Sequence, residues 1–498
     1  MEFCSTRGAH GAVSASQAIL SGLSSDGGLY TPRTLPLFSE SELSGLTSMD
    51  YRGRAAYVLP RFLPDYTSKE LEAYVRQAYG ARFSDRSIAP LREIDAGMHM
   101  LELFHGPTCA FKDFALQLLP QLLTAAAKKC GEERMIAILT ATSGDTGKAA
   151  MEGFADVPGT CICVFYPDGG TSDIQRLQMN TQTGGNVQVF AVKGNFDDTQ
   201  NGVKHIFTDA EAIAALGKSR IMLSSANSIN WGRLAPQTAY YFHAYAELVA
   251  AGKIKLGDKI NFCVPTGNFG NILAGYFAKR SGLPIDKLIC ASNRNNVLTE
   301  FIRTGVYDKN REFYLTSSPS MDILISSNLE RLLFELSGHD CERVCGLMKQ
   351  LGEDGCYDIG REMLDRLREE GFCAYFSDET ATERCIKNIW DQHGYLCDTH
   401  TAVAADSYRQ YREETGDGSP TVVLSTASPF KFAPAILSAL GAPREADDFS
   451  AIEALEKLTG LSAPPQLKNI CGMPERFGGS AIGREDMKAR VLEWLVKA

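Results

Sequence analysis

Residues 104–117 read Phe-His-Gly-Pro-Thr-Cys-Ala-Phe-Lys-Asp-Phe-Ala-Leu-Gln, a turn that leads into an apolar helix with a lysine near its start. Lys112 lies between Phe111 and Phe114, and an ammonium group among apolar side chains is poorly solvated. We therefore expect the pKa of Lys112 to be lowered. A neutral amine can attack an aldehyde and hold it as a Schiff base. The structural alternative is a lysine that reaches solvent from the helix start and pairs with Asp113.

Outward from this stretch, short apolar runs bounded by turn residues alternate with helical stretches from about residue 96 to 445. Strands that alternate with helices predict an α/β fold with mostly parallel sheets flanked by helices. Ligands of such sheets bind beyond the carboxyl ends of the strands, and three polar loops follow expected strands here. The expected buried strands are Met135–Thr140, Thr160–Phe165, Val187–Val192, Ile260–Val264, Leu288–Ala291 and Thr421–Leu424.

The loop after residues 260–264 reads Pro265-Thr266-Gly267-Asn268-Phe269-Gly270-Asn271 and leads into a helix. A Gly-rich turn at a helix N-terminus presents unpaired backbone N–H groups, which bind an anion together with the helix dipole. Glycine also permits the close approach that a bound anion needs. A tight turn without a ligand is the alternative interpretation.

Two further loops carry hydroxyl groups at the same expected sheet edge. One reads Ala141-Thr142-Ser143-Gly144-Asp145-Thr146-Gly147, and hydroxyls and amides at a helix start suit a carboxylate ligand as well as plain N-capping. The other reads Ser425-Thr426-Ala427-Ser428-Pro429-Phe430-Lys431-Phe432, in which Thr426 is either a ligand contact or a cap before a proline-started helix.

Together these segments resemble the threonine synthase family of pyridoxal-phosphate (PLP) enzymes. The 104–117 stretch is similar to the family pattern Phe-x-Gly-Pro-Thr-x-x-Phe-Lys-Asp, and the three loops are similar to Gly-Asn-Phe-Gly-Asn, Thr-Ser-Gly-Asp-Thr-Gly and Ser-Thr-Ala-His-Pro-x-Lys-Phe. The resemblance spans most of the chain. It includes the shorter segments Ser5–Gly8, Asp26–Tyr30, Asn195–Gln200, Asn227–Arg233 and Asp398–Val403.

The resemblance implies a two-lobed PLP fold of type II, with Lys112 as the residue that forms the Schiff base with the cofactor. It assigns the PLP phosphate to Gly267, Asn268, Phe269, Gly270 and Asn271, and the pyridine nitrogen to the hydroxyl of Thr426. A hydroxyl at that nitrogen leaves it unprotonated and tunes the electron sink. By the same resemblance, the α-carboxylate of an amino-acid substrate is held by Thr142, Ser143, Gly144, Asp145 and Thr146.

The implied activity is conversion of O-phospho-L-homoserine and water to L-threonine and phosphate, the last step of threonine biosynthesis. The substrate phosphate needs a pocket of its own, for which Asn227, Ser228, Asn230 and Arg233 are the candidates, because an arginine can fork onto phosphate oxygens. The alternative for Arg233 is a surface or helix-start arginine.

Ser428 stands where the family usually has histidine. This departure leaves open a related PLP phospholyase that releases phosphate, ammonia and a keto acid. A second alternative is a protein that binds PLP or an amino acid without catalysis, although such a protein would usually have lost the lysine or the loops.

The pattern of apolar runs and helical stretches also predicts a division of the chain. We expect residues 1–95 to form a mainly helical N-terminal region and residues 96–445 to form the PLP-dependent catalytic region. Within the latter we expect a small lobe at about 130–230, with the large lobe built from 96–129 and 231–445. Residues 446–498 form a C-terminal helical segment.

Composition excludes several other classes. The chain has 498 residues and a formal net charge of −10, with scattered basic residues, which argues against a nucleic-acid partner. The 14 cysteines lack the spacing of disulfide frameworks or zinc sites, so we expect no metal. No membrane-length apolar run and no apolar signal core are visible. We expect a cytoplasmic enzyme, monomeric or homodimeric, whose partner is a small molecule.

Overall fold

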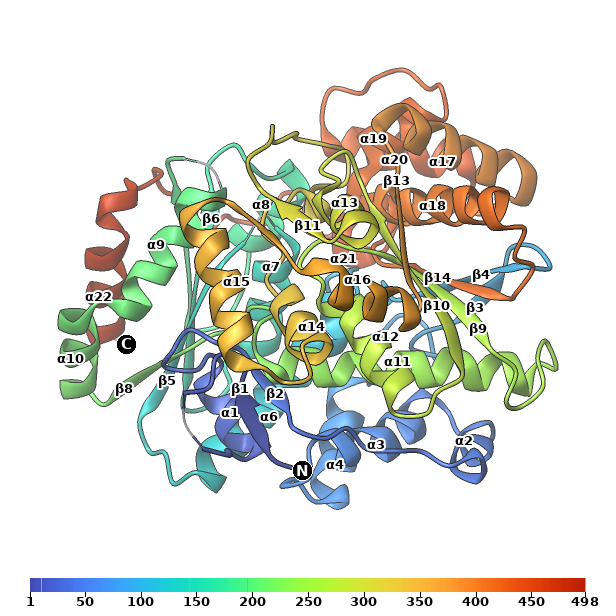
Figure 1. Cartoon of the computed structure of the whole chain (residues 1–498). Coiled ribbons are helices and arrows are strands. Elements are labelled where there is room, and N and C mark those ends of the chain that lie inside the picture. Colours follow the sequence, from blue (N-terminus) through green and yellow to red (C-terminus); the bar gives the residue numbers. More distant parts are fainter. Residues whose placement is uncertain (10, 143, 195, 498) are drawn as a thin grey trace.

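The computed structural model describes residues 1–9, 11–142, 144–194 and 196–497. Two sheets dominate it, one wholly parallel and one mostly parallel (Figure 1). The smaller sheet is wholly parallel and has the order β7-β6-β5-β8. Its strands are β5 (Met135–Ala141), β6 (Thr160–Pro167), β7 (Val187–Val192) and β8 (Ile221–Ser224). Its helices are α7 (Asp145–Phe154), α8 (Asp173–Asn180), α9 (Phe196–Thr208) and α10 (Ala210–Lys218).

The larger sheet has the order β13-β10-β9-β14-β4-β3, and only the edge strand β3 is antiparallel to its neighbour. Helices α11 and α12 cover one face and α18 the other (Figure 1). The strands are β3 (Leu91–Glu93), β4 (Met98–Glu102), β9 (Ile260–Pro265), β10 (Ile285–Ser292), β13 (Phe372–Phe376) and β14 (Thr421–Ser425). The three helices are α11 (Trp231–Ala250), α12 (Gly270–Arg280) and α18 (Thr399–Thr415).

The N-terminal region is mainly helical, as expected, and packs under α11 (Figure 1). Ser14, Ser39 and Thr67 each begin a helix with a reciprocal capping box, which explains where three of its four helices start. The elements are β1 (Phe3–Ser5), α1 (Ala15–Ser21), β2 (Tyr30–Pro32), α2 (Glu40–Leu46), α3 (Tyr51–Phe62) and α4 (Ser68–Ala78).

The remaining elements connect and cover these layers. At the C-terminal end, α22 (Met487–Lys497) packs against α9 and α10 beside the smaller sheet, far from α20 (Figure 1). The others are α5 (Lys112–Leu116), α6 (Leu119–Lys129), α13 (Val297–Thr304), β11 (Val306–Asp308), η1 (Pro319–Met321), α14 (Leu329–Leu336), α15 (Cys341–Glu353), β12 (Cys356–Asp358), α16 (Gly360–Glu369), α17 (Glu379–His393), η2 (Pro429–Phe432), α19 (Ala433–Ala439), α20 (Asp448–Thr459), α21 (Pro465–Lys468) and η3 (Arg484–Asp486).

The α/β architecture expected from the sequence is confirmed, and each of the six expected strands is present. The sequence did not indicate β4, β8 or β13. Strand β4 is buried along its whole length but carries His99 and Glu102, which interrupt the apolar run that marks a buried strand.

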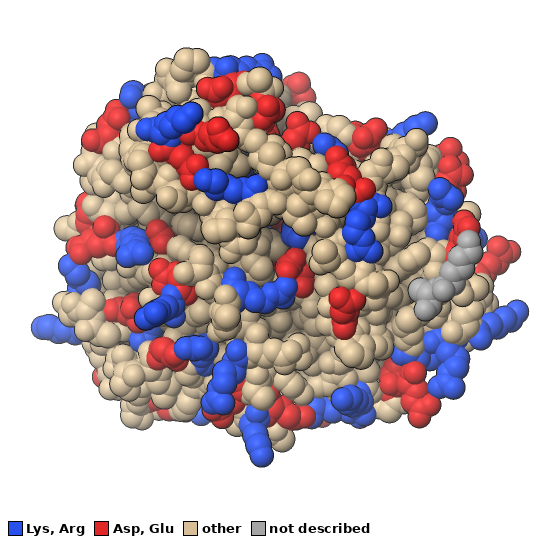
Figure 2. All heavy atoms as spheres, turned by 180° about the vertical axis from the view of Figure 1, so that it is seen from behind, with Lys and Arg blue, Asp and Glu red and all other residues tan. Residues whose placement is uncertain are grey.

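The surface carries charges of both signs. On the face shown in Figure 2, Lys and Arg side chains are interspersed with Asp and Glu. Within the described ranges, no helix is both long enough and apolar enough to cross a membrane.

Candidate active site

A cavity of about 570 Å3 opens where the carboxyl ends of β5, β9 and β14 face each other. Loops that follow strands of both sheets contribute to its wall, and so does the N-terminal region, through Arg7, Ser21, Leu23, Gly27 and Leu29. Gly144 and Asn230 do not line it, and Ser143 lies outside the described residues. The residues expected from the sequence that do line it are Lys112, Thr142, Asp145, Thr146, Asn227, Ser228, Arg233, Gly267, Asn268, Phe269, Gly270, Asn271 and Thr426.

Lys112 begins α5 and is buried. Its Nζ donates to Asp145 Oδ2 at 3.2 Å and to Ser320 Oγ at 3.2 Å, and lies 4.9 Å from the centroid of the Phe111 ring. Burial lowers the pKa of Lys112, and this effect exceeds the opposing attraction of Asp145. The lowered pKa expected from the sequence is confirmed. The expected alternative partner, Asp113, instead accepts hydrogen bonds from the backbone and hydroxyl of Thr108.

The loop of residues 265–271 is an anion cradle by geometry. Phe269 has a left-handed φ of +62°, and Gly270 begins α12. Among the described residues, the backbone N–H groups of 267–271 find no acceptor. Asn271 Oδ1 accepts from Tyr240 at 2.6 Å and Tyr241 at 3.0 Å, which aims its Nδ2 elsewhere, and this buried Nδ2 is unpaired in the described chain. These donors fit a phosphate.

Another part of the cavity wall is the start of α7. The hydroxyl of Thr142 accepts hydrogen bonds from the backbone N–H of Gly144 at 3.0 Å and of Gly147 at 2.9 Å. A Cβ on Gly144 would lie 2.5 Å from the Gln175 side chain, so only glycine fits there. The carboxylate of Asp145 is occupied by lysines, so a ligand at this loop would meet backbone N–H and hydroxyl groups rather than that carboxylate.

Thr426 follows β14 and faces the cavity, while its backbone N–H donates to Thr401 Oγ1 at 3.3 Å. Its carbonyl accepts from Phe111 N at 2.8 Å, which fixes the loop to the Lys112 turn. Ser428 donates its backbone N–H to Cys109 O and is not among the residues that line the cavity. Ser428, the residue that departs from the family pattern, is therefore buried behind the residues that line the cavity.

Arg233 is buried near the start of α11 and lines the cavity. Its Nη1 donates to the carbonyl of Ala226, whereas its buried Nε has no partner in the part of the chain that is described. Burial lowers the pKa of Arg233 to about 10. Asn230 caps α11 and donates to Ile19 O and Ser225 O, so it supports the loop instead of facing the cavity.

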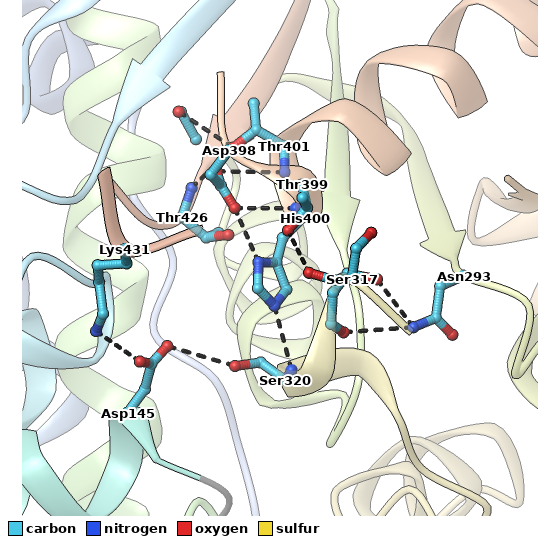
Figure 3. A network of polar contacts seen from close by, with 12 residues as sticks. Asp145, Asn293, Ser317, Ser320, Asp398, Thr399, His400, Thr401, Thr426 and Lys431 are labelled. Carbon is cyan, nitrogen blue, oxygen red and sulfur yellow. Dashed lines mark hydrogen bonds and ion pairs between the residues drawn. The ribbon is translucent and has the colours of Figure 1, made fainter. Parts of the chain in front are cut away.

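Sequence reasoning gave no role to Ser320, His400 or Lys431. Lys431 Nζ pairs with Asp145 Oδ1 at 2.6 Å (Figure 3). His400 Nε2 accepts from Ser320 N at 3.2 Å, and its Nδ1 lies 2.8 Å from Asp398 Oδ1, which assigns the proton to Nδ1. The family segments around residues 398 and 428 contain His400 and Lys431, but a motif does not reveal which side chains converge in space.

Three family models match the chain in order. Residues 2–79 match the threonine synthase N terminus, residues 98–427 match the pyridoxal-phosphate dependent enzymes, and residues 401–478 match the threonine synthase C-terminal model. A threonine synthase of Pseudomonas aeruginosa is 39% identical over 437 residues, which cover 88% of this chain and 90% of that protein. The chain belongs to the threonine synthase family.

Other members of the threonine synthase family agree with this membership. A PLP-bound threonine synthase structure from Brucella melitensis matches with a TM-score of 0.87 at 39% identity, covering 100% of this chain and 99% of that one. Human threonine synthase-like 1 is 40% identical over 85% of this chain, but the match covers 58% of that protein, so this chain spans little more than half the length of such curated relatives. The expected cofactor, PLP, is supported by the family and by that structure.

Proposed function

We propose that this protein is a threonine synthase that converts O-phospho-L-homoserine and water to L-threonine and phosphate. One observation carries the proposal: a single cavity contains a buried lysine with a lowered pKa, a phosphate cradle and a separate arginine, and neither the cradle's N–H groups nor the arginine's Nε has a partner among the residues described. A PLP enzyme acting on a phosphorylated amino acid needs one anion site for each of its two phosphates.

Lys112 would hold PLP covalently, with the N–H groups of residues 267–271 and Asn271 Nδ2 at the cofactor phosphate. Bound there, PLP supplies an electron sink for carbanions at Cα of an amino acid. With its amine free, Lys112 would be positioned to move protons at Cα and Cβ of the substrate as a general base and acid. Its lowered pKa supports this role, because a neutral amine is the form that accepts a proton.

The substrate phosphate is assigned to Arg233 with Asn227 and Ser228, which line the same cavity. The Nε of Arg233 and its neighbouring Nη2 form the edge that a phosphate binds with two parallel hydrogen bonds. Neither atom donates to a residue that the structure describes.

The substrate α-carboxylate is assigned to the start of α7, with Thr142 and Thr146 in the cavity wall. Asp145 contributes there through its backbone, since its carboxylate faces Lys112 and Lys431. Gly144 shapes the loop without lining the cavity.

The proposal extends to the organisation of the protein. We infer a catalytic region at 96–445, a small lobe at about 130–230 around the smaller sheet, and a cytoplasmic monomer or homodimer. The contact of α22 with α9 and α10 suggests that the last helix moves with the small lobe.

Product analysis tests the proposed reaction. Purified protein is incubated with PLP and O-phospho-L-homoserine, and phosphate, threonine and keto acid are quantified together. Threonine equal to phosphate is the expected result. Phosphate with an equal amount of keto acid and no threonine would overturn the proposal and identify a phospholyase, an outcome that no observation favours now that Ser428 lies behind the cavity wall.

A further inference from the structure

Lys431 is a fully buried cation that the proposed chemistry does not use. Its side chain has no solvent exposure, and its Nζ contacts Asp145 Oδ1 at 2.6 Å and the carbonyl of Thr108 at 3.1 Å. It comes from η2, just after the Thr426 loop, and does not line the cavity. A buried ion pair is weak support for stability because desolvation offsets the attraction. This suggests that Lys431 serves something other than folding.

Asp145 connects Lys431 to Lys112. Its Oδ1 accepts from Lys431 and its Oδ2 lies 3.4 Å from Ser320 Oγ (Figure 3). Oδ1 also accepts from Gln175 Nε2 at 3.0 Å, and Oδ2 faces Lys112 Nζ at 3.2 Å. Burial alone would raise the pKa of Asp145, but the two lysines hold it well below its ordinary value. The carboxylate of Asp145 therefore stays ionised, and each of its oxygens contacts one of the two lysines.

We propose that Lys431 is a positioning residue for Lys112, acting through Asp145: it holds the carboxylate so that one oxygen orients the amine. This proposal depends on the proposed function in one respect: the proposed reaction is what gives the free amine of Lys112 a role. Lys431 and Asp145 have opposite electrostatic effects on that amine. The lysine, a like charge, favours the neutral form of Lys112, and the aspartate favours the charged form.

The charged groups with the largest electrostatic effects on Lys112 are Asp145 on α7, Lys431 on η2 and Arg233 on α11, and α7 and α11 pack against α5. His400 on α18 also lines this part of the cavity, and its ring is held by Asp398 and Ser320. On α5 itself, Asp113 turns to Thr108. Only Lys431 and Asp145 are changed in the test, so the other groups remain as a constant background.

The test measures the protonation of Lys112 directly, in protein freed of PLP. Competitive acetylation with isotopic acetic anhydride is followed by mass spectrometry of the Lys112 peptide across pH, because only the neutral amine reacts. Lys431→Met should raise the midpoint by about one to three pH units, and Asp145→Asn should lower it by a similar amount. Lys431→Arg should restore the wild-type midpoint within roughly half a unit.

A matched control is Lys148→Met, which removes another mostly buried lysine, on the same helix as Asp145, that pairs with Glu152 and does not contact Asp145. Its midpoint should equal that of the wild type. If Lys431→Met does not fold, Lys431→Gln replaces it, since the amide can still donate to Asp145 and Thr108.

Shifts of the two variants in the same direction, or no shift in the Lys431 variant, would overturn the proposal and leave a purely structural ion pair. The labelling needs neither substrate nor turnover. A failed product analysis would therefore leave this result intact, and a failed labelling result would leave the reaction assignment intact.

Discussion

Replacing Arg233 by methionine distinguishes the proposed site for the substrate phosphate from the site for the cofactor phosphate. Arg233 is buried, its Nη1 is committed to the carbonyl of Ala226, and the edge formed by Nε and Nη2 is free of described partners. Two hydrogen bonds from a charged donor to phosphate contribute about 1.5 kcal/mol each at the lower end of the measured range. Their loss corresponds to about 3 kcal/mol, or roughly a 100-fold weaker interaction.

We therefore expect Arg233→Met to raise the KM for O-phospho-L-homoserine about 100-fold, and Arg233→Lys about 10-fold because the charge stays while the fork is lost. Phosphate release is measured under steady-state conditions across substrate concentration. PLP affinity, measured by absorbance titration of the cofactor-free protein, should change less than about threefold, because the cradle at 267–271 is untouched.

Two results would refute this reasoning. An unchanged KM would mean that Arg233 does not contact the substrate phosphate. A large loss of PLP affinity with little change in KM would assign the arginine to the cofactor instead. A melting curve of each variant without ligands serves as the control for folding.

Three further predictions test other parts of the molecule. Lys112→Ala should abolish turnover and covalent attachment of PLP, which borohydride reduction followed by mass spectrometry detects; retained attachment would identify a different lysine. Gly267→Ala should weaken PLP binding at least tenfold and cost about 1–3 kcal/mol of stability, because its Cβ would lie 2.5 Å from the carbonyl oxygen of Ser320. Gly346→Ala, which meets no atom within 4 Å, is the control in both titrations. His243 is buried beside an arginine, and burial is the larger cause that lowers its pKa to about 4. The stability it supports is complete above its unfolded pKa of about 6.5 and is lost as pH falls toward 4, so lowering the pH from 7 to 5 should cost the wild type about 2 kcal/mol more than His243→Gln in urea unfolding. Equal losses would exclude His243 as the source.

The elements that could be predicted from the sequence are those whose own residues show a recognisable pattern. Strands β5, β6, β7, β9, β10 and β14 each contain a short, mostly apolar run with turn residues nearby, and these local patterns identify them. Strand β8, Ile-Met-Leu-Ser, is too short to stand out. The edge strand β13 has five residues that are only partly buried as a set, and its pairing with β10 depends on residues more than 80 positions away.

The site divides in the same way. The 265–271 and 426 loops carry their chemistry in glycine, threonine and asparagine at fixed spacing, so a motif identifies them. Lys431 and Ser320 meet Asp145 only because η1, η2 and α7 converge, and nothing local to any of them predicts that meeting. At Asn230 the motif was misleading. An asparagine there suits a ligand contact, but its Nδ2 donates to the carbonyl of Ile19 in α1 and its Oδ1 caps α11.

The position of β14 between β9 and β4 has a consequence for how the protein is made. Strand β4 ends at Glu102, yet its neighbour in the sheet begins at Thr421. At 5–20 residues per second, the ribosome delivers that neighbour about 15 to 60 s later. Until then the turn around Lys112 lacks the carbonyl of Thr426 and the ammonium of Lys431 that fix it. The nascent chain thus carries its reactive lysine for most of its synthesis without these partners, and the pocket around Lys112 is complete only after Lys431 has been made.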